Sequence, residues 1–263
     1  NDAAALAHKQ VQYSAFTYPE GTIVDDLLVY RQGDQDFFLV VNAANIEKDF
    51  DWVTSQSNGF DVTLENVSDA WSQLAIQGPD AVTVMETLFG RVAVNMTFYW
   101  FDYVTYEGKP CILSRTGYTG EDGFEVYCPN DVAVALWQAV LAAGESLKIQ
   151  PCGLACRDTL RLESRMALYG NDIDQTTTVL EAGLGWICKL DKGDFIGADV
   201  LRQQKAEGLE RKLMGFEMVD RGIARHGYPV YLDPDGEPVG DVTSGSYAPH
   251  LDKNIGLVYL PIE

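Results

Sequence analysis

Short apolar runs separated by turn residues dominate the first part of the chain. Residues 27–30 and 37–41 form two such runs, and a polar, glycine-containing segment at 33–36 lies between them. This pattern predicts two buried strands joined as a hairpin. In residues 45–54 the apolar positions instead recur at the spacing of an amphipathic helix. The order strand, strand, helix indicates the start of an α+β unit.

The middle of the chain continues this mixture of strands and helices. Pro79 lies near the start of one predicted helix and Gly90 follows its end, while Gly144 ends an alanine-rich helix. The pattern predicts strands at residues 74–77, 99–106, 111–113 and 124–127 and helices at residues 78–88, 132–143 and 153–163. Because these elements do not alternate regularly as βαβ units, an α+β fold is favoured.

After residue 210 the pattern changes from mixed strands and helices to short strands alone. Glycine, proline and aspartate separate short strand candidates, which indicates an all-β module. The candidates lie at residues 213–218, 228–232, 239–243 and 255–260. A polar helix predicted at residues 198–208 is the connector. The sequence therefore predicts two domains, residues 1–210 and residues 211–263.

Charge and hydropathy exclude several kinds of partner. The formal net charge of −20 opposes binding to nucleic acid or to anionic lipid, because both would be repelled at long range. No apolar run approaches the roughly 18 residues that a membrane helix requires. We therefore expect neither a nucleic-acid partner nor a membrane association.

The cysteines and the first residues indicate a compartment. The chain has 5 cysteines, none in a Cys-x-x-Cys pair, and an odd number argues against a disulfide framework. The start shows neither an initiator Met nor a basic and apolar leader, so no signal peptide is expected and the natural start is expected to be missing. These features favour a reducing, cytoplasmic location.

The usual signatures of catalysis are absent from the sequence. There is no Gly-x-Gly-x-x-Gly, no Gly-Lys-Ser/Thr phosphate loop, no His-Glu-x-x-His and no nucleophile elbow. The histidines His8, His226 and His250 are scattered along the chain, so we predict no metal site.

Two acidic residues, Asp25 and Asp26, directly precede an apolar strand. Adjacent side chains in a strand point to opposite faces, so one carboxylate is expected to face inward. Buried carboxylates need hydrogen-bond donors or have a shifted pKa, and such groups gather at functional sites. The alternative is that an aspartate caps a turn after Gly21.

Two polar, glycine-containing segments follow later in the chain. Residues 117–125 contain Gly117, Gly120 and Gly123, which indicates a tight turn or a close approach of backbone to ligand, although a hairpin tip is the alternative. Residues 169–174 are similarly polar and lead into the glycine-containing segment 180–186. Each signal alone is weak.

Taken in order, these segments resemble the T-protein family of the glycine cleavage system. The resemblance runs from residue 12 to residue 261. Its blocks include Val-Asp-Asp-Leu-Leu-Val-Tyr at 24–30, Val-Val-Asn-Ala-Ala-Asn-Ile-Glu-Lys-Asp at 40–49, Ile-Gln-Gly-Pro at 76–79, Gly-Tyr-Thr-Gly-Glu-Asp-Gly-Phe-Glu at 117–125, Arg-Asp-Thr-Leu-Arg-Leu-Glu at 157–163, Tyr-Gly-Asn-Asp at 169–172 and Arg-His-Gly-Tyr-Pro-Val at 225–230. So many ordered blocks do not agree by chance.

The resemblance implies a fold and an activity. The family fold has two interleaved α/β lobes and a C-terminal antiparallel β-barrel, with folate in a central hole. Family members are aminomethyltransferases. They transfer the one-carbon unit from the aminomethyl-lipoyl arm of H-protein to tetrahydrofolate, giving 5,10-methylenetetrahydrofolate and ammonia. The expected partners are therefore tetrahydrofolate and lipoylated H-protein.

The resemblance also implies roles for single residues. Asp26 corresponds to the essential carboxylate near folate N10, and Asp25 is then structural. The residues that match folate-binding positions are Tyr13, Asn42, Tyr118, Glu125 and Arg157. A carboxylate such as Glu125 can accept two hydrogen bonds from the amino-pyrimidine part of a pterin. Without the family context, Arg157 and Arg161 would be ordinary charges on a helix surface.

The chain departs from the family pattern at both ends. It begins shortly before Tyr13, so the N-terminal portion with its Ser-His-Met-Gly-type motif is missing. It stops after Pro261, before the last strands and an arginine that helps to hold the folate tail. We therefore expect a T-protein that lacks its N-terminal portion and its C-terminal end.

Two other functions remain open from the sequence. One is a tetrahydrofolate-dependent demethylase of the same superfamily. The other is a non-enzymatic folate-binding factor for iron–sulfur assembly, whose branch carries a Lys-Gly-Cys-Tyr-x-Gly-Gln-Glu motif. This chain has Lys192, Gly193 and Asp194 at that point, without the cysteine.

Overall fold

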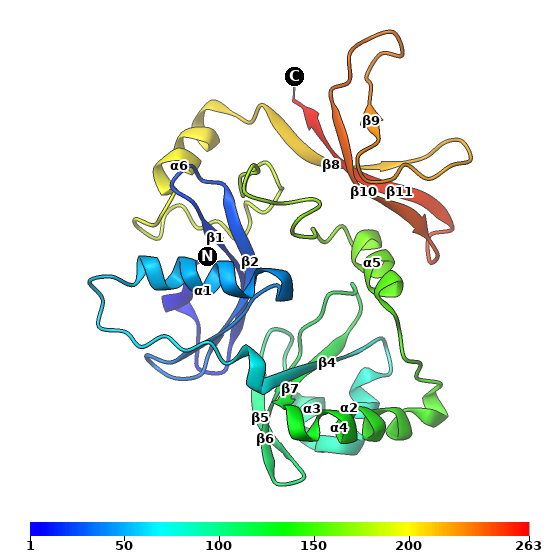
Figure 1. Ribbon diagram of the computed structural model, residues 1–263. Helices are drawn as coiled ribbons and strands as arrows, with labels where there is room; N and C mark the ends of the chain where they lie inside the picture. Colours follow the sequence, from blue (N-terminus) through cyan, green and yellow to red (C-terminus); the bar gives the residue numbers. More distant parts are fainter. Residues whose placement is uncertain (263) are drawn as a thin grey trace.

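The first lobe is a three-stranded antiparallel sheet with a helix beside it (Figure 1). The structure is a computed structural model that describes residues 1–262. The lobe contains η1 (Ala3–Ala5), β1 (Val11–Thr17), β2 (Ile23–Arg31), β3 (Phe37–Val40), η2 (Ala43–Asn45) and α1 (Ile46–Gln56), with strand order β1-β2-β3. The predicted hairpin and helix are confirmed. The prediction that both strands are buried is wrong for β3, an edge strand that leaves Phe37 and Leu39 exposed.

The second lobe is a four-stranded antiparallel sheet whose strands have the order β4-β7-β6-β5. Its elements are η3 (Ser68–Ala70), β4 (Trp71–Gln77), α2 (Ala81–Phe89), α3 (Arg91–Asn95), β5 (Phe101–Tyr106), β6 (Lys109–Ser114), β7 (Gly123–Pro129) and α4 (Asn130–Ala143). Apolar side chains of α2 and α4 form the main core with one face of the sheet, including Met85, Phe124 and Leu136. The other face meets the first lobe through Tyr30 and Tyr127.

After the second lobe the chain returns to the first. It passes through η4 (Glu145–Leu147), α5 (Leu154–Glu163) and an irregular segment at residues 164–197, and then forms α6 (Ala198–Glu207). Ile173, Ile187 and Leu201 from this return pack against Ile23 of β2. The two lobes are therefore interleaved in sequence, as the resemblance implied. Figure 1 shows this yellow-green segment and α6 beside β1.

The C-terminal part is an antiparallel sheet of four strands that curls into a partial barrel (Figure 1). Its strands are β8 (Arg211–Glu217), β9 (Pro229–Val230), β10 (Gly240–Ala248) and β11 (Lys253–Pro261), in the order β8-β11-β10-β9. Leu162 of α5 packs against Leu213, Leu257 and Tyr259 of this sheet. The α+β class and the late β-rich part are confirmed. The last residue of the predicted domain 211–263 lies outside the described residues.

A helix that spans a lipid bilayer needs about 20 predominantly apolar residues. Across residues 1–262, each helix is too short or too polar to cross a lipid bilayer.

Candidate functional site

Strand β2 places Asp25 and Asp26 on opposite faces of the first sheet. Asp25 is paired with Phe16 and Asp26 with Ala15, and the Asp25 side chain is completely buried. The prediction that one carboxylate faces inward is confirmed. The turn-capping alternative is wrong, because both residues lie within the strand.

The carboxylate of Asp26 is held by two neutral donors. The Tyr13 hydroxyl donates to Oδ2 over 2.9 Å, and the Asn42 Nδ2 donates to Oδ1 over 2.9 Å. Burial, followed by the charge of Asp25, raises the pKa of Asp26 to about 6, although both hydrogen bonds act in the opposite direction. A carboxyl group with this pKa can accept and release a proton near neutral pH.

The Asn42 side chain connects the two carboxylates. Its Nδ2 lies 2.9 Å from Asp25 Oδ1 and 2.9 Å from Asp26 Oδ1. The Asn42 backbone N–H also donates to Asp25 Oδ2 over 3.1 Å, and Asn45 Nδ2 donates to Asp25 Oδ1 over 2.7 Å. These contacts fix the orientation of the amide that reaches Asp26.

Tyr118 and Arg157 form a second part of the site. The Arg157 guanidinium carbon lies 4.5 Å from the centroid of the Tyr118 ring, and the Tyr118 hydroxyl donates to the Ala167 carbonyl over 2.5 Å. Burial raises the pKa of Tyr118, and the nearby Asp26 charge adds to this effect. The phenol therefore stays neutral, and the two parts of the site lie close enough to interact electrostatically. Arg157 itself is exposed.

Glu125 on β7 lies in a buried hydrogen-bond network. Gln73 Nε2 donates to Oε1 and the Thr116 hydroxyl donates to Oε2, each over 2.5 Å, and the Tyr127 hydroxyl reaches Oε2 over 3.4 Å. Burial raises the pKa of Glu125, and Arg157 is among the groups that lower it. Oε1 has one donor and keeps a free lone pair. The folate-binding role of Glu125 stays a prediction, as do those of Tyr13, Asn42, Tyr118 and Arg157.

Trp186 also lies in this region, although no sequence pattern predicted a role for it. Its ring centroid lies 5.8 Å from that of Tyr13, and the side chain is 61% exposed. This exposed indole packs against Tyr13, which hydrogen-bonds to Asp26, and it offers a flat surface for a planar ligand. Its position at the end of the glycine-containing block 180–186 is the signal that could have identified it.

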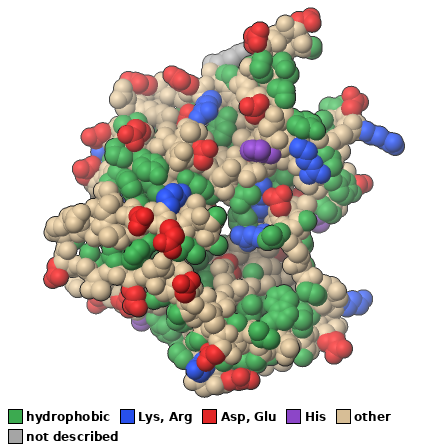
Figure 2. Space-filling model, in the orientation of Figure 1, with side chains coloured by type: hydrophobic (Ala, Val, Ile, Leu, Met, Phe, Trp, Pro, Cys, Tyr) green, Lys and Arg blue, Asp and Glu red, His purple; other side chains and the backbone are tan. Residues whose placement is uncertain are grey.

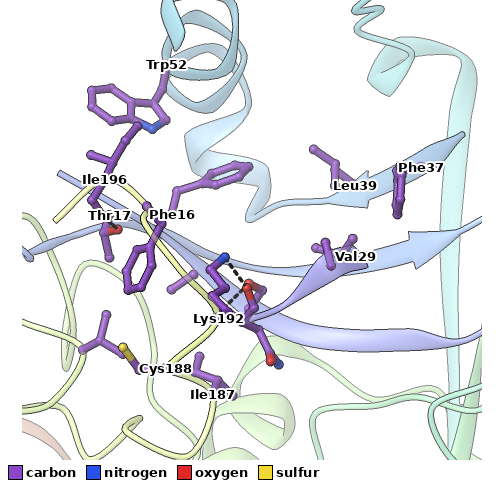
Figure 3. A pocket seen from close by; sticks show the side chains of 16 residues that line it. Phe16, Thr17, Val29, Phe37, Leu39, Trp52, Ile187, Cys188, Lys192 and Ile196 are labelled. Carbon is purple, nitrogen blue, oxygen red and sulfur yellow. Dashed lines mark hydrogen bonds between the residues drawn. The ribbon is translucent and has the colours of Figure 1, made fainter. Parts of the chain in front are cut away.

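The structure also contains a cavity of about 450 Å³ away from these residues (Figure 3). Phe16, Val29 and Leu39 line it from the face of the first sheet that carries Asp25, opposite to Asp26. The lining is largely apolar, and among residues 1–262 it includes none of the predicted site residues and no carboxylate. It therefore offers no carboxyl group for proton transfer. By contrast, Figure 2 shows the surface hollowed where the lobes meet, with Lys or Arg side chains at the hollow.

Family models and similar proteins of known name all point to the glycine cleavage T-protein family. A family model described as the GCVT N-terminal domain matches residues 1–192, and a model described as the glycine cleavage T-protein C-terminal barrel domain matches residues 211–263. An aminomethyltransferase of Desulfitobacterium hafniense strain Y51 is 48% identical over 263 residues, which cover 100% of this chain and 72% of the relative. An aminomethyltransferase of Caldanaerobacter subterraneus subsp. tengcongensis is 48% identical over 261 residues, or 99% of this chain and 69% of the relative.

A solved structure is similar as well. The crystal structure of the glycine cleavage system aminomethyltransferase T from Bartonella henselae has a TM-score of 0.89 and 34% sequence identity, and the match covers 99% of this chain and 70% of that chain. The names of these proteins favour the aminomethyltransferase prediction over the demethylase and the iron–sulfur assembly factor.

Proposed function

This chain belongs to the glycine cleavage T-protein family of aminomethyltransferases, and on that premise we propose the reaction and its residues. The chain transfers the one-carbon unit carried as an aminomethyl group on the lipoyl arm of H-protein to tetrahydrofolate. The products are 5,10-methylenetetrahydrofolate, ammonia and H-protein whose lipoyl arm carries the released thiol. Tetrahydrofolate supplies the nucleophilic nitrogens for this transfer, so the protein needs no nucleophile of its own.

The observation that carries the proposal is the environment of Asp26. The carboxyl is held by Tyr13 and Asn42, and its pKa of about 6 lies close to neutral pH. Release of ammonia requires a proton on the departing nitrogen and removal of a proton from the accepting amine. A carboxyl group with this pKa can relay such protons in either direction. Asp26 is therefore our candidate for the catalytic residue.

The residues around Asp26 suit a reduced folate. The exposed Trp186 ring and the Tyr13 ring provide apolar surfaces for a pterin. The Oε1 of Glu125 has room for one further N–H donor, which fits the amino-pyrimidine edge of a pterin. Arg157 supplies an exposed cation over Tyr118, suited to the anionic tail of folate or to the approach of the lipoyl arm.

The domain division and the location are part of the same proposal. We assign residues 1–210 to folate binding and residues 211–263 to a C-terminal barrel domain that packs on α5. All the cysteines, Cys111, Cys128, Cys152, Cys156 and Cys188, are free thiols. Free thiols suit a reducing compartment, which supports a cytoplasmic location.

An assay with purified protein, aminomethylated H-protein and tetrahydrofolate tests the proposed function. We expect formation of methylenetetrahydrofolate together with ammonia. In Asp26→Asn the carboxyl can no longer exchange a proton, so kcat should fall about 100-fold, within the range for loss of a general acid or base. Tetrahydrofolate affinity should change less than about threefold, because the amide keeps the size and polarity of the side chain.

The matched control is Asp51→Asn on α1, since Asp51 is exposed. It should turn over like the wild type. Absence of product from the wild-type chain would refute the proposed activity. Full turnover by Asp26→Asn would leave the activity standing and remove Asp26 from its role.

A further inference from the structure

Asp49 is a buried carboxyl group that the proposed reaction does not use. It lies on α1, and its side chain is 2% exposed. Neither of its oxygens receives a hydrogen bond from a donor within residues 1–262. An ionised carboxylate buried without donors is strongly destabilising, so this group keeps its proton instead.

The carboxyl group nearest in effect to Asp49 is that of Asp25 on β2: after burial, hydrogen bonding with Asp25 and the charge of Asp25 are the largest causes that raise the pKa of Asp49. Two carboxylates are both acceptors, so this contact requires a proton on one of them. Asp25 already accepts N–H hydrogen bonds from Asn42 and Asn45, whereas no donor within residues 1–262 reaches Asp49. Asp49 is therefore the donor of the pair.

Lys48 is next to Asp49 in the sequence, but its ammonium group does not form a hydrogen-bonded ion pair that would stabilise an ionised Asp49. Its Nζ lies 4.0 Å from Asp49 Oδ1, which is too long for a hydrogen bond. The ammonium instead donates to the Val24 carbonyl and lies 3.9 Å from the centroid of the Tyr169 ring. Burial is the main cause that raises the pKa of Asp49 to about 8, and the contact with Asp25 raises it further than Lys48 lowers it.

The carboxyl groups here do not suggest a metal ion. Within the described part of the chain, no group of three His, Cys, Asp or Glu side chains is arranged to hold one. The partner that Asp25 and Asp26 share is the Asn42 amide, 2.9 Å from an oxygen of each. The arrangement holds a proton.

We propose that Asp49 is a positioning residue for the transfer reaction. Its O–H donates to Asp25, Asp25 accepts from the Asn42 amide at 2.9 Å, and the same amide donates to Asp26 at 2.9 Å. The inference rests on the proposed function, because it assigns to Asp49 the orientation of the catalytic carboxyl.

Ionisation of Asp49 has a defined consequence. It removes the donor to Asp25 and places a second negative charge against that group, so the Asn42 amide loses its fixed orientation. The titratable and charged groups that face Asp49 are Asp25 and Asp26 from β2, Lys48 from α1 and Tyr169 from the irregular segment. The activity should therefore decline as pH rises through the pKa of Asp49.

The test compares pH profiles of kcat for the wild type, Asp49→Asn and Asp49→Ala. In the wild type kcat should fall about tenfold per pH unit above roughly pH 8, as for loss of one essential proton. Asn keeps a donor to Asp25 and cannot ionise, so Asp49→Asn should keep kcat at pH 7 and lose this decline. Asp49→Ala has no donor and should have a lower kcat at pH 7, with the KM for tetrahydrofolate nearly unchanged. Asp51→Asn is the exposed control and should keep the wild-type profile.

A measurement independent of activity completes the test. Carboxyl ¹³C NMR of the full chain should show an aspartate that titrates near pH 8, and this signal should be missing in Asp49→Asn. If the wild type transfers no one-carbon unit, the proposed function fails, and the NMR titration still decides the state of Asp49. The inference is overturned if no aspartate titrates above pH 7, or if Asp49→Asn keeps the alkaline decline of an active wild type.

Discussion

Two groups of charged side chains in this molecule differ in how their charge is compensated: one contains ion pairs, and the other has only neutral hydrogen-bond donors. One surrounds Arg161 of α5, whose side chain is 1% exposed and bonds to Asp172 over 2.5 Å, to Asp158 over 2.6 Å and to Ser244 over 2.8 Å. The other surrounds Asp26, where carboxyl groups gather and the N–H donors are neutral amides. We refer to them as the arginine cluster and the aspartate cluster.

This difference in charge pairing indicates that the arginine cluster stabilises the fold and that the aspartate cluster can exchange protons. In the arginine cluster opposite charges meet, and the cluster ties α5 to the irregular segment and to β10. Asp172 also accepts from the Thr243 hydroxyl over 2.6 Å, and the Tyr259 hydroxyl donates to the Asp172 carbonyl over 2.8 Å. In the aspartate cluster no Lys or Arg within residues 1–262 forms an ion pair with Asp26, and the pKa of Asp26 is raised to about 6. Paired charges hold the C-terminal sheet, whereas unpaired acids keep exchangeable protons.

The largest expected effect is the loss of the arginine cluster. Arg161→Met leaves Asp172 buried without its cation, and breaking a buried pair in this way costs about 3–5 kcal/mol of unfolding free energy. The side chain of Asp172 is 0% exposed, so water cannot compensate for the loss. Urea unfolding monitored by tryptophan fluorescence measures the difference.

The control for this prediction is a surface ion pair of the same C-terminal sheet. Lys253 Nζ lies 2.8 Å from Glu217 Oε2, and the two side chains are 50% and 53% exposed. Lys253→Met should cost less than about 1 kcal/mol, because exposed pairs are weak. If Arg161→Met costs no more than this control, the arginine cluster does not stabilise the fold.

A smaller effect is expected from a change within the aspartate cluster. The hydrogen bond from the Tyr13 hydroxyl favours the ionised form of Asp26 and therefore lowers its pKa. Tyr13→Phe removes this bond, so the pKa should rise by about one unit. If ionised Asp26 is the active form, kcat is lost as pH falls through this pKa. The acid limb of the kcat profile should therefore move about one pH unit upward.

Affinity and stability separate this effect from damage to the fold. The phenyl ring that Tyr13→Phe leaves in place keeps the packing against Trp186, so tetrahydrofolate affinity should stay within about threefold of the wild type. Tyr103→Phe is the control, because Tyr103 is 47% exposed and lies outside the cluster. An unchanged acid limb in Tyr13→Phe would show that Asp26 does not set the pH dependence.

The sequence predicted the strand and the helix that carry the aspartate cluster, but it did not predict that Asp49 is buried. Alternation along β2 correctly predicted that one of two adjacent aspartates is buried. The helix over residues 45–54 was also predicted, but its apolar spacing gives no reason for Asp49 to be its buried residue. That burial arises where α1 meets β2, as in the hydrogen bond from Lys48 to the Val24 carbonyl, and this contact forms only in the folded chain.

The arginine cluster was missed for the same physical reason. Helical spacing places Arg161 one turn after Arg157, and the sequence offers no pattern that separates them. In the structure Arg161 is buried and Arg157 is exposed. Asp172 and Ser244 decide this outcome, and both lie in parts of the chain whose position is set by tertiary packing. The irregular segment 164–197 has no hydrophobic period, so its return to the first lobe followed only from the family resemblance.

The smallest effect is expected at Arg157, which lies on the same helix, α5, as Arg161. Arg157 stacks over the Tyr118 ring at 4.5 Å but is exposed, unlike Arg161. Arg157→Gln removes an exposed cation from the proposed folate site, so tetrahydrofolate should bind about two- to fivefold more weakly, a change of about 0.5–1 kcal/mol. Loss of the exposed cation–π contact with Tyr118 should lower the unfolding free energy by no more than about 1 kcal/mol. Arg157→Lys keeps the charge without the planar stacking and separates these two contributions. Titration calorimetry and urea unfolding on the same samples measure both quantities. A loss of stability in Arg157→Gln as large as that in Arg161→Met would show that the two arginines share one structural role.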